Sequence, residues 1–191
     1  MMKKFEMSDL GLLHYFLSLE VKQGVDGIFI SQKKYAMDLL KKFNMVNNKV
    51  AATLMNVNEK LCRDDGAKLE NATYLRSLVG GLIYLSHTRP DIAFSIGRIL
   101  RYIARTIGHG IWNSKVSNFK LTSFTDNDWA GSIDDRKGTS GFMFNIGFSA
   151  ISWSSKKQEV VTLSTSEAEY ITATSSTCQA VWLRRLLADF N

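Results

Sequence analysis

The fold is decided by residues 119–170, which read FKLTSFTDNDWAGSIDDRKGTSGFMFNIGFSAISWSSKKQEVVTLSTSEAEY. This segment begins with an apolar and β-branched run that ends at Phe124. Two stretches, 139–146 and 150–154, then alternate apolar and polar residues, which is typical of half-buried strands. Gly147-Phe148-Ser149 between them predicts a turn, and a helix pattern begins at Ser164. We therefore expect a three-stranded meander that leads into a helix.

Two carboxylates stand at the two ends of this segment. Asp126 follows the apolar strand, and Glu169 lies near the start of the helix, 43 residues later. That length of chain holds two more strands, so the strand end and the helix start can meet. Converging carboxylates repel unless a cation lies between them, and such oxygen ligands suit Mg²⁺ or Mn²⁺. The pair predicts a metal site for phosphodiester hydrolysis, with Asp126 and Glu169 as catalytic residues and metal ligands.

Helix capping favours Glu169 over Glu167 as the ligand. Ser164-x-x-Glu167 is a capping box, in which the glutamate side chain reaches back to the backbone N–H of the cap. Glu169 lies two positions on, about 200° round the helix, and is free to face the strand. Ser166-x-x-Glu169 also fits a capping box. A structural alternative therefore stays open, in which Asp126 is a turn residue and Glu169 complements the helix dipole.

Composition narrows the class of protein. The chain has 191 residues, of which 45% are hydrophobic and 22% charged, as in a soluble globular protein. We expect no membrane partner, since no apolar run approaches the roughly 20 residues that span a bilayer. The first residues lack the apolar core of a secretory signal. Cys62 and Cys178 are isolated thiols, so we expect an intracellular protein, cytoplasmic or nuclear.

The net charge of +6 is concentrated in the first part of the chain. Residues 1–118 carry 17 Lys and Arg against 10 Asp and Glu, whereas residues 119–191 carry 7 against 8. A basic part joined to a near-neutral part with clustered acids fits a polyanion-binding region and a metal-using region. Lys33 and Lys34 are candidates for contacts with nucleic acid. Taken alone, these lysines are better explained as the solvent-exposed face of a helix, so both interpretations stay open.

The first part of the chain predicts a hairpin and three helices. Alternation over 15–22 and the run 28–30 predict two strands joined by a turn. Ser31 is the expected cap of the first helix, whose apolar face holds Tyr35, Leu39 and Phe43. We expect a loop over 44–71, a helix from Thr73, a break at Pro90, a helix over 91–105 and a polar linker over 113–118.

Three arginines align on the helix expected over 91–105. Arg98, Arg101 and Arg105 recur at spacings of three and four, so they fall on one side of that helix. Such a stripe could bind a phosphate backbone, or it could be a solvated face.

The sequence resembles the reverse transcriptase to ribonuclease H segment of copia-type long-terminal-repeat retrotransposon Pol polyproteins. The resemblance covers nearly the whole chain and depends on many motifs in one order. They are Leu10-Gly11-Leu12-Leu13-His14-Tyr15-Phe16-Leu17, Ile30-Ser31-Gln32-Lys33-Lys34-Tyr35, Tyr74-Leu75-Arg76-Ser77-Leu78-Val79-Gly80, Thr88-Arg89-Pro90-Asp91-Ile92-Ala93-Phe94, Asp126-Asn127-Asp128-Trp129-Ala130-Gly131, Arg136-Lys137-Gly138-Thr139-Ser140-Gly141, Trp153-Ser154-Ser155-Lys156-Lys157-Gln158 and Ser166-Glu167-Ala168-Glu169-Tyr170.

The resemblance implies an α+β fold in two parts. Residues 1–112 correspond to the end of the reverse transcriptase palm and a shortened thumb-like region of hairpin plus helices. Residues 119–191 correspond to the N-terminal portion of a ribonuclease H-like domain, a truncated mixed sheet with a flanking helix. By motif, Asp126 and Glu169 are the first two acids of a quartet that holds two Mg²⁺ ions. The implied partners are an RNA–DNA hybrid or other nucleic acid and the remainder of the polyprotein.

Departures from the family pattern leave the activity open between two hypotheses. The paired aspartates of the polymerase have no counterpart after Met1, so the resemblance predicts no polymerase site. The third and fourth acids of the quartet would lie beyond Asn191, so a two-ion site would be impaired. The first hypothesis is an RNA–DNA hybrid ribonuclease by ancestry. The second is a noncatalytic nucleic-acid-binding remnant.

Overall fold

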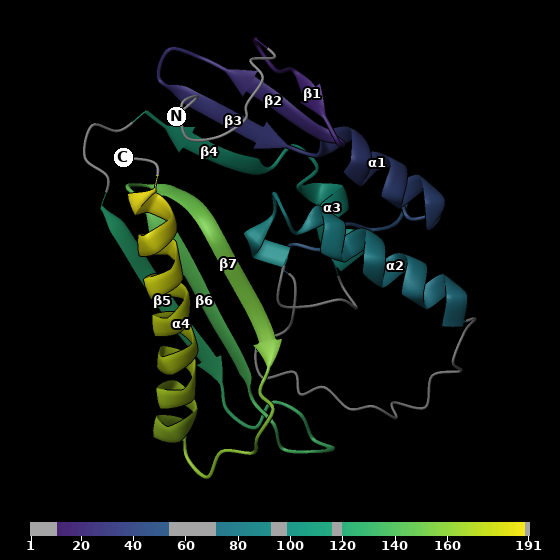
Figure 1. Cartoon of the computed structure of the whole chain (residues 1–191). Helices are drawn as coiled ribbons and strands as arrows, with labels where there is room; N and C mark the ends of the chain where they lie inside the picture. Colours follow the sequence, from purple (N-terminus) through teal and green to yellow (C-terminus); the bar gives the residue numbers. More distant parts are fainter. Residues whose placement is uncertain (1–10, 54–71, 93–98, 116–119, 190–191) are drawn as a thin grey trace.

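The computed structural model describes residues 11–53, 72–92, 99–115 and 120–189. Within them the chain forms two antiparallel sheets and four α-helices, so the prediction of an α+β fold is confirmed. Figure 1 shows the first sheet with helices α1 to α3 beside it, and the second sheet with the long helix α4 across it. In the described residues, no helix combines the length and apolar character needed to cross a membrane.

The first sheet has the strand order β1-β2-β3-β4. Its strands are β1 (Tyr15–Phe16), β2 (Leu19–Gln23), β3 (Gly27–Ser31) and β4 (Gly110–Ser114). The single strand expected over 15–22 is wrong, because Leu17 and Ser18 have φ values of 45° and 61° and turn the chain back. Positive φ at both central residues is the geometry of a two-residue hairpin turn.

Strand β4 was not expected from the sequence. Asn113 and Ser114, which were placed in a polar linker, pair with Ile28 and Gly27 of β3. The backbone supplies these ladder bonds whatever the side chains are, so a polar end to a strand leaves little trace in the hydrophobic pattern. The polar linker therefore begins later than predicted, and residues 116–118 of it lie outside the described residues.

Close approach of β3 and β4 requires glycine at position 27. A Cβ there would collide with the backbone carbonyl oxygen of Asn113, and backbone cannot move aside. We expect Gly27→Ala to lower the free energy of unfolding by about 1–3 kcal/mol, the usual cost of overpacking. Gly24→Ala is the matched control, because the nearest atom would be 3.7 Å away, an ordinary contact. Urea unfolding of both variants tests this, and equal losses would contradict it.

Helices α1 (Lys33–Lys42), α2 (Ala72–Leu85) and α3 (Ile99–Arg105) enclose the main apolar core. The predicted helix from Thr73 is confirmed as α2, and the break at Pro90 is a short 3₁₀ helix over Pro90–Ile92. The last part of the helix expected over 91–105 is confirmed as α3. Residues 93–98 of that expected helix lie outside the described part. The core contains Ala36, Leu39, Leu40, Phe43, Leu82, Leu85, Ile92, Leu100 and Ile103.

Ser31 does not cap α1, so that expectation is wrong. Ser31 is buried in β3, and the N-cap is Gln32. The backbone N–H of Lys34 donates to the carboxylate of Glu20 on β2 at 2.6 Å. A side chain from the neighbouring strand thus satisfies a free N–H of the first turn, as a local cap otherwise does.

A buried guanidinium joins the residues that follow α2 to the end of α3. Arg89 is 2% exposed and donates to both carboxylate oxygens of Asp91, at 2.8 and 2.6 Å. It also donates to the carbonyl and the hydroxyl of Thr106, at 3.0 and 2.8 Å. Burial raises the pKa of Asp91, but the hydrogen bonds and charge of Arg89 outweigh it, and the pKa lies below its ordinary value.

The second sheet has the order β5-β6-β7, with β5 (Leu121–Asp128), β6 (Thr139–Ile146) and β7 (Ser149–Lys157). The predicted meander is confirmed, and Gly147-Phe148 forms the turn between β6 and β7. A mixed sheet was expected, but the described strands are all antiparallel. The connections are ten residues from β5 to β6 and two from β6 to β7, shorter than the crossover that a parallel pair needs. Helix α4 (Thr165–Ala188) packs on β5 and β6 and buries Phe144 and Ala168 completely.

The two sheets touch along β4 and β7. The backbone N–H of Ser114 donates to the hydroxyl of Ser149 at 3.2 Å. Further along β7, the indole N–H of Trp153 donates to the carbonyl of Ser86 at 3.0 Å, just after α2 ends. These bonds join the part that carries α1 to α3 to the part that carries α4.

Candidate functional site

Strand β5 places Asp126 at an open edge of the second sheet. Among the described strands, β5 pairs with β6 alone, and Asp126 lies opposite Gly141. Its side chain is exposed, and one carboxylate oxygen accepts from the backbone N–H of Asn127 at 2.9 Å. Asp126 therefore lies within the strand, two residues before its end, with its carboxylate open to solvent.

Strand alternation decides which face of the sheet Asp126 occupies. Asn127 lies opposite Ser140, whose hydroxyl is 2.7 Å from the hydroxyl of Thr172 on α4. Ser140 and Asn127 are thus on the face that α4 covers. Successive side chains point to opposite faces, so Asp126 is on the other face, at the edge.

The capping box at the start of α4 is confirmed with one difference. The Ser164 hydroxyl accepts from the backbone N–H of Glu167 at 3.2 Å, as predicted. The Glu167 carboxylate accepts a hydrogen bond from the backbone N–H of Leu163 at 2.6 Å. The capping box predicted the backbone N–H of Ser164 as the donor instead. Glu167 is therefore occupied at the helix start, which leaves Glu169 as the candidate ligand.

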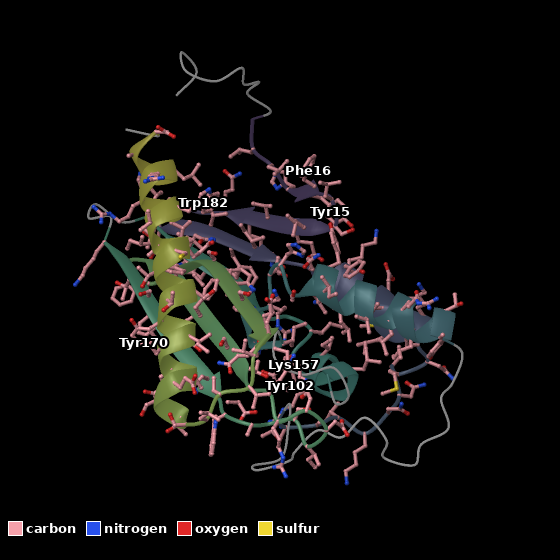
Figure 2. The ribbon with its side chains drawn as sticks, turned by 60° about the horizontal axis from the view of Figure 1, so that its bottom comes forward. Tyr15, Phe16, Tyr102, Lys157, Tyr170 and Trp182 are labelled. Carbon is pink, nitrogen blue, oxygen red and sulfur yellow. The ribbon has the colours of Figure 1, made fainter. Side chains whose placement is uncertain are left out.

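Glu169 lies on the side of α4 that faces the open edge of β5. Ala180 follows it by 11 residues and Leu187 by 18, so at 100° per residue all three fall within about 20° of one direction. Ala180 and Leu187 line a hollow of about 480 Å³ together with Leu121 and Ser123 of β5. Glu169 itself is exposed. Its neighbour Tyr170, labelled in Figure 2, is 77% exposed and leaves this part of the helix open to solvent.

The end of β5 and the start of α4 lie at the same end of the sheet (Figure 1). The indole N–H of Trp129, the residue after β5, donates to the carbonyl of Thr162, three residues before α4, at 3.1 Å. Asp126 and Glu169 therefore both lie towards this end of the sheet, Asp126 on the uncovered face and Glu169 on the helix that covers the other face. That the two carboxylates meet on one ion stays a prediction.

Asp128 is next to this edge but takes part in a turn. A Cβ at position 131 would collide with the carboxylate of Asp128, so that carboxylate lies directly over Gly131. The backbone carbonyl of Asp128 leaves equally little room at Gly138. Glycine is required at position 138, where the close atom is backbone, whereas at position 131 the exposed Asp128 side chain could move aside.

A buried polar cluster at the start of α4 was not found from the sequence. The carboxamide nitrogen of Gln158 donates to the hydroxyl of Ser140 at 2.9 Å and to the carbonyl of Ala168 at 3.4 Å. The Thr172 hydroxyl donates to the same carbonyl at 2.9 Å. The signal in the sequence was Ser140, a polar residue on the same face of the strand as the apolar Phe142 and Phe144.

Lysines at this end of the sheet are paired with acids. Lys157 lies 2.8 Å from Asp135, and Lys156 lies 3.0 Å from Glu159. Hydrogen bonding by Lys157 lowers the pKa of Asp135 to about 2. Asp135 is exposed, and its carboxylate has an ion-pair partner. Lys157 therefore already has an acidic partner.

The residues predicted to bind nucleic acid are only partly described. Lys33 and Lys34 are exposed on α1, and the Lys34 ammonium lies 5.8 Å from the centre of the Tyr15 ring at the edge of the first sheet (Figure 2). Arg105 is exposed at the end of α3. Arg98 and the side chain of Arg101 lie outside the described part, so the arginine stripe stays a prediction.

Comparison with known proteins places the chain in a family. Residues 1–57 match the family model described as reverse transcriptase (RNA-dependent DNA polymerase). The retrovirus-related Pol polyprotein from transposon RE2 of Arabidopsis thaliana is 37% identical over 98% of this chain. The corresponding polyprotein from transposon TNT 1-94 of Nicotiana tabacum is 34% identical over the same share. The chain belongs to the copia-type retrotransposon Pol family.

The chain spans about 14% of the length of the RE2 Pol polyprotein and 16% of that from TNT 1-94. An uncharacterised mitochondrial protein of Arabidopsis thaliana is similar over a larger share of its own length. It is 35% identical over 93% of this chain, which covers 81% of that protein. No solved structure matched this Pol chain.

Proposed function

We propose that β5 and α4 of this Pol chain form a ribonuclease H-type site that cuts the RNA strand of an RNA–DNA hybrid. The observation that carries the proposal is the placement of two exposed carboxylates, Asp126 and Glu169, towards one end of the second sheet. Glu169 is a better candidate ligand than Glu167, because the Glu167 carboxylate already accepts a hydrogen bond at the helix start. The resemblance to Pol polyproteins makes a nucleic acid the expected substrate class.

The residues at the edge fit a divalent cation. Carboxylate oxygens are the ligands that Mg²⁺ and Mn²⁺ prefer, and Mg²⁺ is commonly held by one or two carboxylates together with water and substrate phosphates. Among the described residues, no three or more His, Cys, Asp or Glu gather round one point. Asp126 and Glu169 would therefore hold the ion with few protein ligands, and weak binding is expected. A bound ion there supplies Lewis-acid stabilisation of a phosphodiester oxygen.

The rest of the chain supplies orientation and charge. The capping box fixes the start of α4, and the Trp129–Thr162 hydrogen bond joins the segment before it to the end of β5. Excess positive charge lies in residues 1–118, with 17 Lys and Arg against 10 Asp and Glu, which suits a phosphate backbone. A hybrid differs from DNA by its 2′-hydroxyls and its groove shape, and these are the features that a protein can recognise.

Cleavage assays with a labelled hybrid test the proposal. The 191-residue chain is incubated with a duplex of labelled RNA and DNA, with Mn²⁺ or with EDTA, and with the same sequence as double-stranded DNA. We expect slow cutting of the RNA strand in the hybrid that requires the metal. Hybrid binding that is independent of metal, without cleavage, would contradict the proposal.

That contrary result would favour a noncatalytic nucleic-acid-binding function. One observation supports this second candidate. The carboxylate of Asp126 already accepts a local hydrogen bond from Asn127, as aspartates in purely structural roles do. In that case Lys33 and Lys34 would hold the backbone, and the two acids would be dispensable for binding.

A further inference from the structure

We propose that Gln158 is the positioning residue of the metal site, and that it sets the direction of Glu169. This inference rests on the proposed function of Asp126 and Glu169. Gln158 follows β7 and is 5% exposed, although it belongs to neither β7 nor α4. Its backbone N–H donates to the carbonyl of Gly138 at 2.8 Å, so its own position is fixed by the start of β6.

The Gln158 carboxamide joins the sheet to the helix at the residue before Glu169. It donates to the hydroxyl of Ser140 on β6 and to the carbonyl of Ala168 on α4, at 2.9 and 3.4 Å. Ala168 is completely buried, so the helix cannot turn there without breaking its packing. The direction of Glu169 follows from that of Ala168, because neighbouring helical residues are 100° apart.

The hydrogen bonds form a closed set with one consistent assignment of protons. Gln158 donates to Ser140, Ser140 donates to Thr172 at 2.7 Å, and Thr172 donates to the Ala168 carbonyl at 2.9 Å. Three groups from the sheet, the connection and the helix thus converge at one helical turn. Ser140 also lies opposite Asn127, the residue next to Asp126. The set therefore bonds to Ala168, the neighbour of Glu169, and lies across the strand ladder from Asn127, the neighbour of Asp126.

Replacement of Gln158 by methionine separates positioning from folding. Methionine has a similar unbranched shape and removes both donors. Ser140 and Thr172 keep each other as partners, and the Ala168 carbonyl keeps the Thr172 hydroxyl. The variant also removes the Gln158 carboxamide oxygen, which is buried and has no hydrogen-bond partner among the described residues. Because few groups lose their only partner, stability should change little.

The test measures Mn²⁺ binding through the electron paramagnetic resonance signal of the free ion. We expect Gln158→Met to raise the Kd for Mn²⁺ by about 10-fold, the low end of the effect of losing a group bonded to a ligand, because Gln158 acts through Ala168 and touches neither carboxylate. Its Tm should stay within about 4 °C of wild type. Ser140→Ala should raise the Kd less, and it serves if the methionine variant does not fold. Gln32→Met is the control for loss of a buried carboxamide far from the site, since Gln32 is 2% exposed and precedes α1. It removes the acceptor of the Thr88 hydroxyl, so its Tm should fall while its Kd stays unchanged.

A second measurement without metal separates this inference from the proposed function. Amide hydrogen exchange at residues 168–172 should be faster in Gln158→Met than in wild type. If Gln158→Met changes neither the exchange rates nor the Kd for Mn²⁺, the inference is overturned. The proposed function still holds in that case if Asp126→Asn and Glu169→Gln raise the Kd. If Asp126→Asn and Glu169→Gln each bind Mn²⁺ with the same Kd as wild type, both the inference and the proposed function are overturned.

Discussion

Asp126→Asn and Glu169→Gln are each expected to lower Mn²⁺-dependent cleavage of an RNA–DNA hybrid by about 100-fold or more. Each change keeps the shape of the side chain and removes one charged ligand. A bound ion contributes several kcal/mol of charge stabilisation, and loss of ~3 kcal/mol corresponds to about 100-fold in rate. Initial rates over a range of Mn²⁺ concentrations measure the effect, and high Mn²⁺ should restore part of the activity.

Glu167→Gln is the matched control for these two variants. It removes a carboxylate two residues from Glu169, on a side chain that is bonded to the Leu163 backbone. Glutamine can still accept that bond, so α4 should keep its start and cleavage should stay within about 3-fold of wild type. Equal losses in Glu167→Gln and Glu169→Gln would contradict the assignment of Glu169. They would indicate a general effect of negative charge at the helix start.

Arg89→Met is expected to lower the free energy of unfolding by about 3 kcal/mol. The substitution leaves the Asp91 carboxylate without the guanidinium and removes both donors to Thr106. Breaking a buried ion pair commonly costs 3–5 kcal/mol, and the low end applies because the Asp91 side chain is 35% exposed. Guanidinium chloride unfolding followed by circular dichroism measures the change.

Arg105→Met provides the comparison for Arg89. Arg105 is exposed at the end of α3, next to Thr106, so its loss should cost less than about 0.5 kcal/mol. A loss from Arg89→Met no larger than that from Arg105→Met would show that the contacts of Arg89 with Asp91 and Thr106 contribute little to stability.

Local patterns predicted the second part of the chain better than the first. Alternation over 139–146 corresponds to β6 residue for residue, and the Ser164 capping box marks the start of α4. Both features depend on near neighbours in the sequence. Strand β4 depends instead on pairing with β3, more than 75 residues earlier, and its end is polar. Such long-range pairing leaves no periodic signal when the side chains are not apolar.

The candidate site was predicted in part. The choice of Glu169 over Glu167 followed from capping, and the observed bond to Leu163 supports it. The face of Asp126 could not be known, because it depends on the register with β6 and on which face α4 covers. Gln158 was missed for a similar reason. Its role appears only when Ser140 and Ala168, 28 residues apart, are brought together.

Paramagnetic broadening by Mn²⁺ tests the central claim most directly. In ¹⁵N-labelled chain, the ion should broaden the amide signals of Asp126 and Glu169 at the same substoichiometric concentrations, since one ion lies near both. Asp126→Asn should then reduce the broadening at Glu169, and Glu169→Gln the broadening at Asp126. The two acids do not share an ion if only one of the two amide signals broadens. The same conclusion follows if the broadening of each signal is unchanged when the other carboxylate is removed.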